Sequence, residues 1–276
     1  MILARCNFGA CPKSLAKESF EDMVHEYFAA LLQNWQVLDH YDLAWLDNTL
    51  FVYTPLPRKD AIADFYHSSL GQMSLDKIND MTKSVPTWEV LDDQSEEELD
   101  SIEDIKSLVL FTSFLEIGSP LICLTTRKPI AIFSLEIPEK LRNDIYFWRK
   151  RYHIFDSLFM DSSALEVESY KQIADHESEL SREGLKICKN LEKITGIESY
   201  YYLHRYAGKA GEGLEFDRPC PICGEVWLVI RKSEIDLLHH KPLDFSFQCK
   251  NCRLVSHHPQ CTDDQRLASI GLNLPD

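Results

Sequence analysis

Two short cysteine motifs predict the fold of the C-terminal part of the chain: Cys220-Pro-Ile-Cys223-Gly224 and Cys249-Lys-Asn-Cys252. Each Cys-x-x-Cys pair can form a tight turn that brings two sulfurs toward one tetrahedral centre. A glycine after the second cysteine suits such a turn, because glycine adopts positive φ without steric cost. Four thiolates saturate a zinc ion and leave no position for water or substrate. We therefore expect one structural Zn²⁺ per chain.

The 25 residues between the two pairs predict how the metal site is carried. Val226–Ile230 and Phe245–Gln248 are short apolar runs typical of strands, and each lies beside one cysteine pair. The pairs would then sit on β-hairpins, which is the zinc-ribbon arrangement. A rubredoxin-like iron centre uses similar pairs and stays open as an alternative. A redox dithiol is a weaker alternative, because the strand-to-helix context of such motifs is missing.

The residues around the motifs carry a resemblance to a known family. The run Tyr200-Tyr-Tyr-Leu-His-Arg-Tyr206 leads into a Gly/Lys linker, Trp227 follows the first pair, and Arg253-Leu-Val-Ser256 follows the second. With the two pairs, residues 198–256 resemble an uncharacterised bacterial family described as zinc-ribbon-containing and as a candidate for nucleic-acid binding. The resemblance implies that the four cysteines are metal ligands in a bacterial, cytoplasmic protein. It implies no catalytic residues.

Upstream of the ribbon, apolar periodicity predicts a mixture of strands and helices. Expected strands are Ile2–Phe8, Asn48–Tyr53, Trp88–Leu91, Ser107–Phe114, Leu121–Thr125 and Pro129–Leu135, and expected helices cover residues 19–35 and 58–82. Two further helices, at about 139–160 and 164–194, would form a packed hairpin, with Gly184 interrupting the apolar seam of the second.

Glycine becomes frequent near residue 207, which indicates a domain boundary. We predict an α+β fold. Residues 1–206 would form a mixed α/β body that includes the helical hairpin at about 139–194. Residues 207–276 would form a small C-terminal β zinc ribbon.

Charge separates the two predicted domains. The chain has 44 acidic and 29 basic residues, a formal net charge of -15, and residues 1–204 hold -14 of it. A negative field attracts basic partners and repels phosphate backbones and anionic membranes. Eight carboxylates are concentrated in thirteen residues and form a candidate partner-binding surface, with a solvated loop as the alternative. They are Asp92, Asp93, Glu96, Glu97, Glu98, Asp100, Glu103 and Asp104.

Targeting features do not stand out. No uninterrupted apolar run approaches the length of a membrane-spanning helix, and the N-terminus lacks the pattern of a secretory signal. Nine cysteines fit reduced thiols or metal ligands better than disulfides. We expect a cytoplasmic protein without a membrane partner.

Catalytic motifs are also missing. The sequence has no phosphate loop, no GxSxG, no HExxH and no GxGxxG, and no carboxylate pair stands out by its spacing. From this we expect the chain not to be an enzyme.

Two binding functions follow. The first is capture of a basic protein by the acidic body, as an immunity protein or antitoxin neutralises a basic toxin. The alternative is nucleic-acid binding through the ribbon and the adjacent strand, whose aromatic rings could stack on bases. The candidate residues for that alternative are Tyr200, Tyr202, His204, Arg205 and Tyr206. The sequence gives no indication of the oligomeric state.

Overall fold

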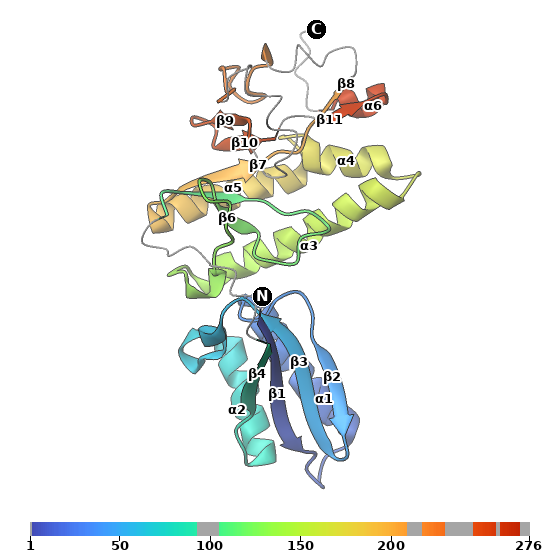
Figure 1. Ribbon diagram of the computed structural model, residues 1–276, viewed down its shortest axis with the longest axis vertical. Helices are drawn as coiled ribbons and strands as arrows, with labels where there is room; N and C mark the ends of the chain where they lie inside the picture. The colour runs from blue at the N-terminus through green and yellow to red at the C-terminus, as the bar shows by residue number, and fades with distance from the viewer. Residues whose placement is uncertain (1, 93–104, 209–216, 230–244, 258–259, 271–276) are drawn as a thin grey trace. The chain divides into compact units, whose positions relative to one another are not determined.

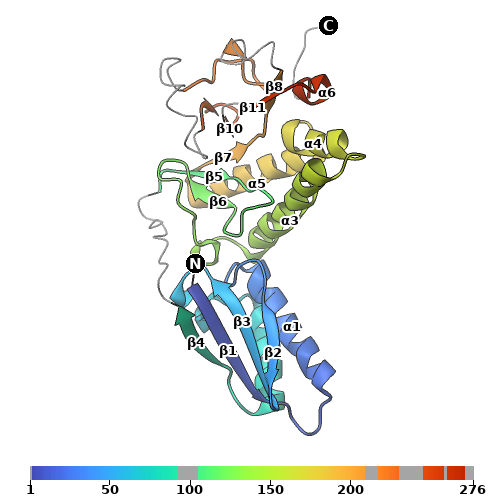
Figure 2. The same ribbon diagram turned by 45° about the vertical axis from the view of Figure 1, so that its right-hand side comes forward.

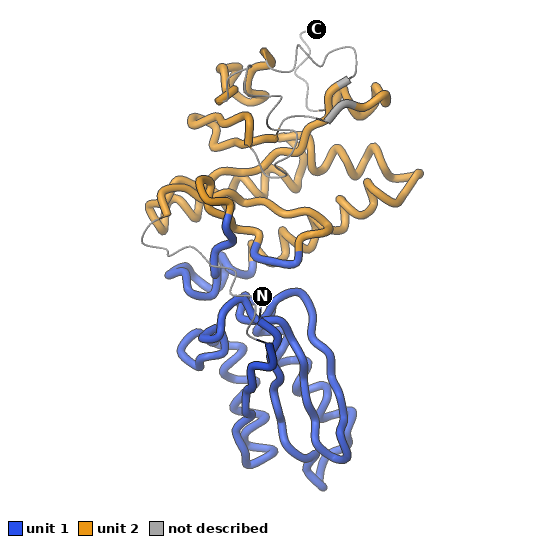
Figure 3. Tube along the Cα trace, viewed as in Figure 1, with its two compact units in different colours: residues 1–102, 117–119, 128–143 blue, residues 103–116, 120–127, 144–276 orange. Residues whose placement is uncertain are grey.

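A computed structural model describes residues 2–92, 105–208, 217–229, 245–257 and 260–270. It divides into two compact units (Figure 3). Unit 1 comprises residues 1–102, 117–119 and 128–143, and unit 2 comprises residues 103–116, 120–127 and 144–276. The boundary predicted at residue 206 therefore falls inside unit 2. The predicted α+β class is confirmed.

Unit 1 is a four-stranded antiparallel sheet with two helices on one face (Figures 1 and 2). Its elements are β1 (Ile2–Ala10), α1 (Lys17–Gln33), β2 (Asp42–Leu46), β3 (Thr49–Leu56), α2 (Ser69–Thr82) and β4 (Thr87–Asp92). The strand order is β2-β3-β1-β4. This βαββαβ connection with a central β1–β3 pair is the ferredoxin-like topology.

The core of unit 1 follows the two periodicities of the sequence. Alternate residues of β1, from Ile2 to Phe8, are buried, as expected for a sheet with one covered face. Phe20, Val24 and Leu31 of α1 pack against them, as the helical spacing predicts.

The predicted helix at 58–82 is shorter in the structure. Two 3₁₀ turns come first, and α2 begins only after Ser68, whose hydroxyl accepts a hydrogen bond from the Gly71 N–H at 3.1 Å. This N-cap fixes the helix start, because a serine side chain satisfies an otherwise unpaired amide.

Unit 2 contains a five-stranded sheet in the order β6-β5-β7-β10-β9. Its strands are β5 (Ser107–Leu110), β6 (Leu121–Cys123), β7 (Glu198–Tyr202), β9 (Phe247–Cys249) and β10 (Leu254–Ser256). β5, β7 and β10 run parallel, whereas β6 and β9 are antiparallel to their neighbours. A separate parallel pair joins β8 (Tyr206–Gly208) to β11 (Gln260–Thr262).

Helices α4 (Glu166–Ala174), α5 (Glu179–Thr195) and α6 (Gln265–Ala268) belong to unit 2, and α3 (Glu139–Asp161) begins in unit 1 and continues into it. The prediction of one helix over 164–194 is wrong, because the helical conformation is interrupted between α4 and α5. Ser178 caps α5 by accepting a hydrogen bond from the Ser181 N–H at 3.0 Å.

Two predicted strands are also wrong. Pro129–Leu135 contains a 3₁₀ turn at Ile132–Ser134. In the described part of Val226–Ile230, the β pairing is a single bridge from Leu228 to Phe247. Among the described residues, no helix combines the length and the apolar character needed to cross a membrane.

Candidate metal centre

The four cysteines of the two motifs converge in the structure. The Sγ atoms of Cys220, Cys223, Cys249 and Cys252 all lie within 4.8 Å of one another. The Sγ atoms of Cys223 and Cys249, which come from different pairs, are 3.6 Å apart. Cys220 and Cys249 are buried, whereas Cys223 is exposed. Four thiols this close can bind a metal ion.

Local backbone geometry explains why each pair turns back on itself. In the first pair, the Gly224 N–H donates to the Cys220 carbonyl at 2.9 Å, and Gly224 has a φ of 75°. In the second pair, the Cys252 N–H points at the Cys249 Sγ at 3.4 Å. Arg253 follows with a φ of 54°. Both pairs therefore end on a residue in the left-handed region, but only the first uses glycine there.

The thiols differ in acidity because their surroundings differ. Burial is the main cause that raises the pKa of Cys220 to about 11. A backbone N–H from Glu225 is the main cause that lowers the pKa of Cys223. A bound cation favours all four thiolates, because it compensates the charge that burial and mutual repulsion oppose.

The second pair is part of the central sheet. β10 follows Cys252 and lies between β7 and β9. The Tyr201 N–H donates to the Arg253 carbonyl at 2.8 Å, and the Leu203 N–H donates to the Val255 carbonyl at 2.9 Å. The ribbon therefore shares backbone hydrogen bonds with β7, which precedes the first pair in the chain.

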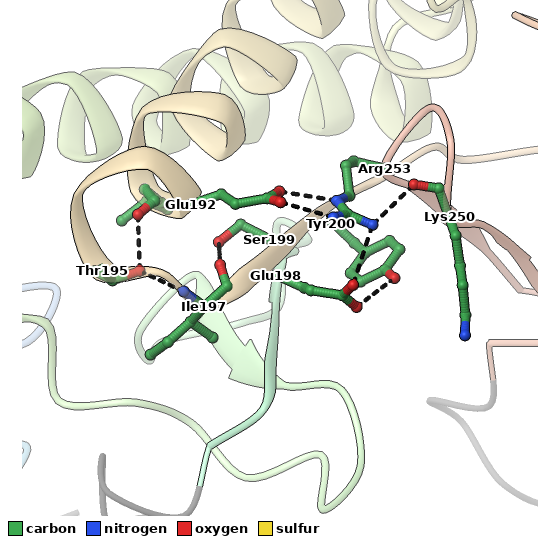
Figure 4. Close-up of polar contacts among 9 residues, drawn as sticks. Glu192, Thr195, Ile197, Glu198, Ser199, Tyr200, Lys250 and Arg253 are labelled. Atoms are coloured by element: carbon green, nitrogen blue, oxygen red, sulfur yellow. Dashed lines mark hydrogen bonds and ion pairs between the residues drawn. The ribbon is translucent and has the colours of Figure 1, made fainter.

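A cluster of charged residues, which the sequence did not indicate, surrounds Arg253 (Figure 4). Its guanidinium donates to both carboxylate oxygens of Glu192 on α5, at 2.8 and 2.7 Å, and lies 3.4 Å from the Glu198 carboxylate. It stacks 5.4 Å from the centre of the Tyr200 ring. The sequence signal that could have indicated this cluster is Arg253 itself, because the first pair has glycine at the same position after its second cysteine.

Aromatic residues pack around the segment that follows the first pair. Trp227 is buried against Phe247, with ring centres 5.2 Å apart, and its indole N–H donates to the Arg218 carbonyl at 3.0 Å. The Arg205 guanidinium lies 5.1 Å from the Trp227 ring and 4.7 Å from the Phe247 ring. Arg205, one of the candidate nucleic-acid residues, is buried and lies against these two rings.

The other candidate nucleic-acid residues are mostly inside the protein. Tyr200 and Tyr202 are buried in a core with Val109, Ile122 and Val255. The Tyr202 hydroxyl lies 2.7 Å from Nδ1 of His257. His204 and Tyr206 are half-buried. In this structure Tyr200 and Tyr202 have no free ring face to offer a base.

The acidic segment is described at one residue only. Asp92 is exposed at the end of β4. The other seven carboxylates of the segment, at positions 93, 96, 97, 98, 100, 103 and 104, lie outside the described residues.

Comparison with known proteins gives families without an assigned role. Two families match, each described as a domain of unknown function: DUF2310 over residues 102–204 and DUF8594 over residues 210–261. Two relatives, both called uncharacterized proteins of Haemophilus influenzae, are 35% identical over 150 residues. The match covers 54% of this chain, 70% of the first relative and 54% of the second. The chain thus spans about half the length of the second relative.

One solved structure, an antibiotic biosynthesis monooxygenase, is similar over 34% of this chain and 100% of its own, at 14% identity and a TM-score of 0.26. The matching protein is an enzyme, and the prediction that this chain is not an enzyme is withdrawn, because it rested on missing catalytic motifs alone. Missing motifs do not exclude an activity. At this TM-score, neither the activity nor the fold of that protein is carried over.

Proposed function

The chain belongs to the same family as the Haemophilus influenzae protein of which it covers 70%, and for this chain we propose the role of a cytoplasmic zinc-ribbon protein that acts by binding a basic protein. The metal part of the proposal rests on the four converging cysteines. The partner part rests on the charge of the chain.

Zinc suits the donor set by number, chemistry and spacing. Thiolate–zinc bonds of about 2.3 Å at tetrahedral angles separate the sulfurs by about 3.8 Å. The Cys223–Cys249 separation of 3.6 Å is close to this value. Four protein thiolates leave no coordination position open, so the ion would stabilise the fold of the ribbon.

Charge favours a basic partner. Residues 1–204 hold 34 acidic and 20 basic side chains. Complementary charge accelerates encounter and selects against partners of like charge. A basic toxin neutralised by an acidic immunity protein or antitoxin is the most concrete partner of this kind. Nucleic acid is the weaker candidate, because the net charge repels phosphate and Tyr200 and Tyr202 are buried.

Isothermal titration calorimetry with a panel of basic nuclease toxins tests the partner. We expect at least one toxin to bind at low ionic strength and to bind more weakly as salt is added. Replacing Glu96, Glu97 and Glu98 by glutamine removes three charges from the acidic segment and should weaken that binding. A matched control removes three exposed charges elsewhere, with Glu18→Gln, Asp22→Asn and Asp80→Asn.

The outcomes separate the candidates. Loss of binding only with the Glu96–Glu98 variant supports a specific acidic surface, whereas equal loss with the control indicates the net field alone. Binding to no toxin at low ionic strength refutes the proposed partner. A gel shift with single- or double-stranded nucleic acid at low salt would favour the alternative.

A further inference from the structure

Arg253 occupies a backbone position that favours glycine. Its φ is 54°, and Gly224 fills the equivalent place after the first cysteine pair with a φ of 75°. A side chain with a Cβ is disfavoured in this region, whereas glycine is not. The contacts of the Arg253 side chain therefore offer a reason for an arginine at this position.

The Arg253 side chain contacts two carboxylates and one aromatic ring. Two parallel hydrogen bonds reach Glu192, a third carboxylate oxygen comes from Glu198, and the ring of Tyr200 lies beneath (Figure 4). Bidentate arginine–carboxylate pairs are stronger and more directional than single ion pairs. This pairing lowers the pKa of Glu192 and raises that of Arg253.

The same guanidinium also supports the second cysteine turn from within. Nη1 of Arg253 donates to the Lys250 carbonyl, inside the Cys249–Cys252 turn, at 2.8 Å. The Arg253 carbonyl in turn accepts the Tyr201 N–H of β7. One residue thus contacts the thiol-bearing turn, helix α5 and strand β7.

From these contacts we infer that Arg253 is a positioning residue that couples the metal centre to the body: it holds the second cysteine pair in its metal-binding turn while it docks β10 on β7. Metal binding and strand docking then favour each other by the same factor, because coupling between two equilibria is reciprocal. The inference rests on the metal binding proposed above and does not depend on the identity of the partner.

Metal affinity of the full chain is the first readout, measured by competition between Zn²⁺ and a chromophoric chelator. We expect Arg253→Ala to lower the affinity about 10-fold to 100-fold, the range found when groups that orient metal ligands are removed. Arg253→Lys keeps the charge but loses the bidentate geometry and should fall between. Glu192→Gln provides a second route to the same effect if the alanine variant fails to fold.

Hydrogen exchange at two amides is the second readout. The Tyr201 and Leu203 amides donate to the carbonyls of Arg253 and of Val255 in β10, so removal of metal should accelerate their exchange in the native sequence. Arg253→Ala should accelerate it even with metal bound. Amides between β1 and β3 in unit 1 serve as an internal reference, because they lie in a different sheet.

Arg151→Ala is the matched control variant, because Arg151 also pairs with a glutamate of α5, Glu183, but lies outside the ribbon. It should leave the zinc affinity unchanged. The inference is overturned if Arg253→Ala binds zinc as tightly as the native chain, or if Arg151→Ala weakens binding equally. Failure of the native chain to bind zinc would instead refute the proposed metal centre.

Discussion

Gly184 in the middle of α5 marks a close contact between this helix and strand β7 of the sheet in unit 2. A Cβ at this position would lie 2.2 Å from Cε2 and 2.6 Å from Cδ2 of Tyr201, and 3.0 Å from Nε1 of Trp148. Both rings are buried. The Tyr201 hydroxyl lies 3.2 Å from the Ser181 hydroxyl, one helical turn earlier on α5. The ring therefore has little freedom to move aside.

The expected effect of Gly184→Ala is the difference of two opposing contributions. Alanine gains about 1 kcal/mol over glycine inside a helix. Forcing an extra methyl group into a packed core costs about 1–3 kcal/mol. An ordinary contact is near 3.5 Å, so the Tyr201 ring must shift by more than 1 Å, which places the cost at the upper end. We expect a net loss of about 2 kcal/mol in the free energy of unfolding.

Urea unfolding followed by circular dichroism measures this change. The control is Gly71→Ala, another helical glycine, whose added Cβ would meet nothing closer than Ser68 Oγ at 3.4 Å. That variant should be as stable as the native chain or more stable, because the helical gain is not opposed by overlap. A Gly184→Ala variant with native or higher stability would show that α5 and β7 separate easily, and the packing argument would then fail.

Three further outcomes are expected. Cys220→Ser and Cys249→Ser should each lower the metal content from about one ion per chain and reduce the thermal stability of the ribbon, as metal analysis and melting with and without chelator would show. Burial lowers the pKa of His204 to about 4 from 6.5. Between these two pH values the unfolded chain binds a proton that the folded chain does not, so the free energy of unfolding should fall as pH drops from about 6.5 toward 4. His204→Phe should remove that part of the pH dependence in urea titrations. Lys83 ends α2 with a φ of 56°, so Lys83→Gly should raise the melting temperature through a gain of about 1 kcal/mol.

Motif spacing and periodicity predict those features of the chain that depend on neighbouring residues. Each Cys-x-x-Cys pair brings its own two sulfurs together because a tight turn needs only local geometry, and the convergence of the two pairs was predicted because a zinc ion takes four ligands. α1 and β1 follow their apolar patterns because one face of each is buried against the other. Where the apolar residues of a segment are the ones that become buried, the sequence predicts the helix or strand correctly.

Prediction from the apolar pattern fails where a residue that is not part of that pattern determines the local structure. The seam over 164–194 continues across the break between α4 and α5, and the Ser178 cap decides where the second helix starts. Gly184 was expected to interrupt that seam, and in the structure it is the point where Tyr201 of β7 approaches α5. A long-range contact of this kind leaves no periodic trace in the sequence.

Charge and composition suggested a neutral ribbon attached to an acidic body, and the topology adds a physical connection between them. β10 lies between β7 and β9, so the strand next to the second cysteine pair also covers the edge of β7. Val255 of β10 joins Val109, Tyr200 and Tyr202 in one buried cluster. Loss of the proposed metal would therefore weaken a core that is built from both the ribbon and the acidic residues 1–204. The proposed basic partner would then bind a protein whose stability depends on the ribbon, so we expect metal occupancy and partner binding to be coupled in this chain.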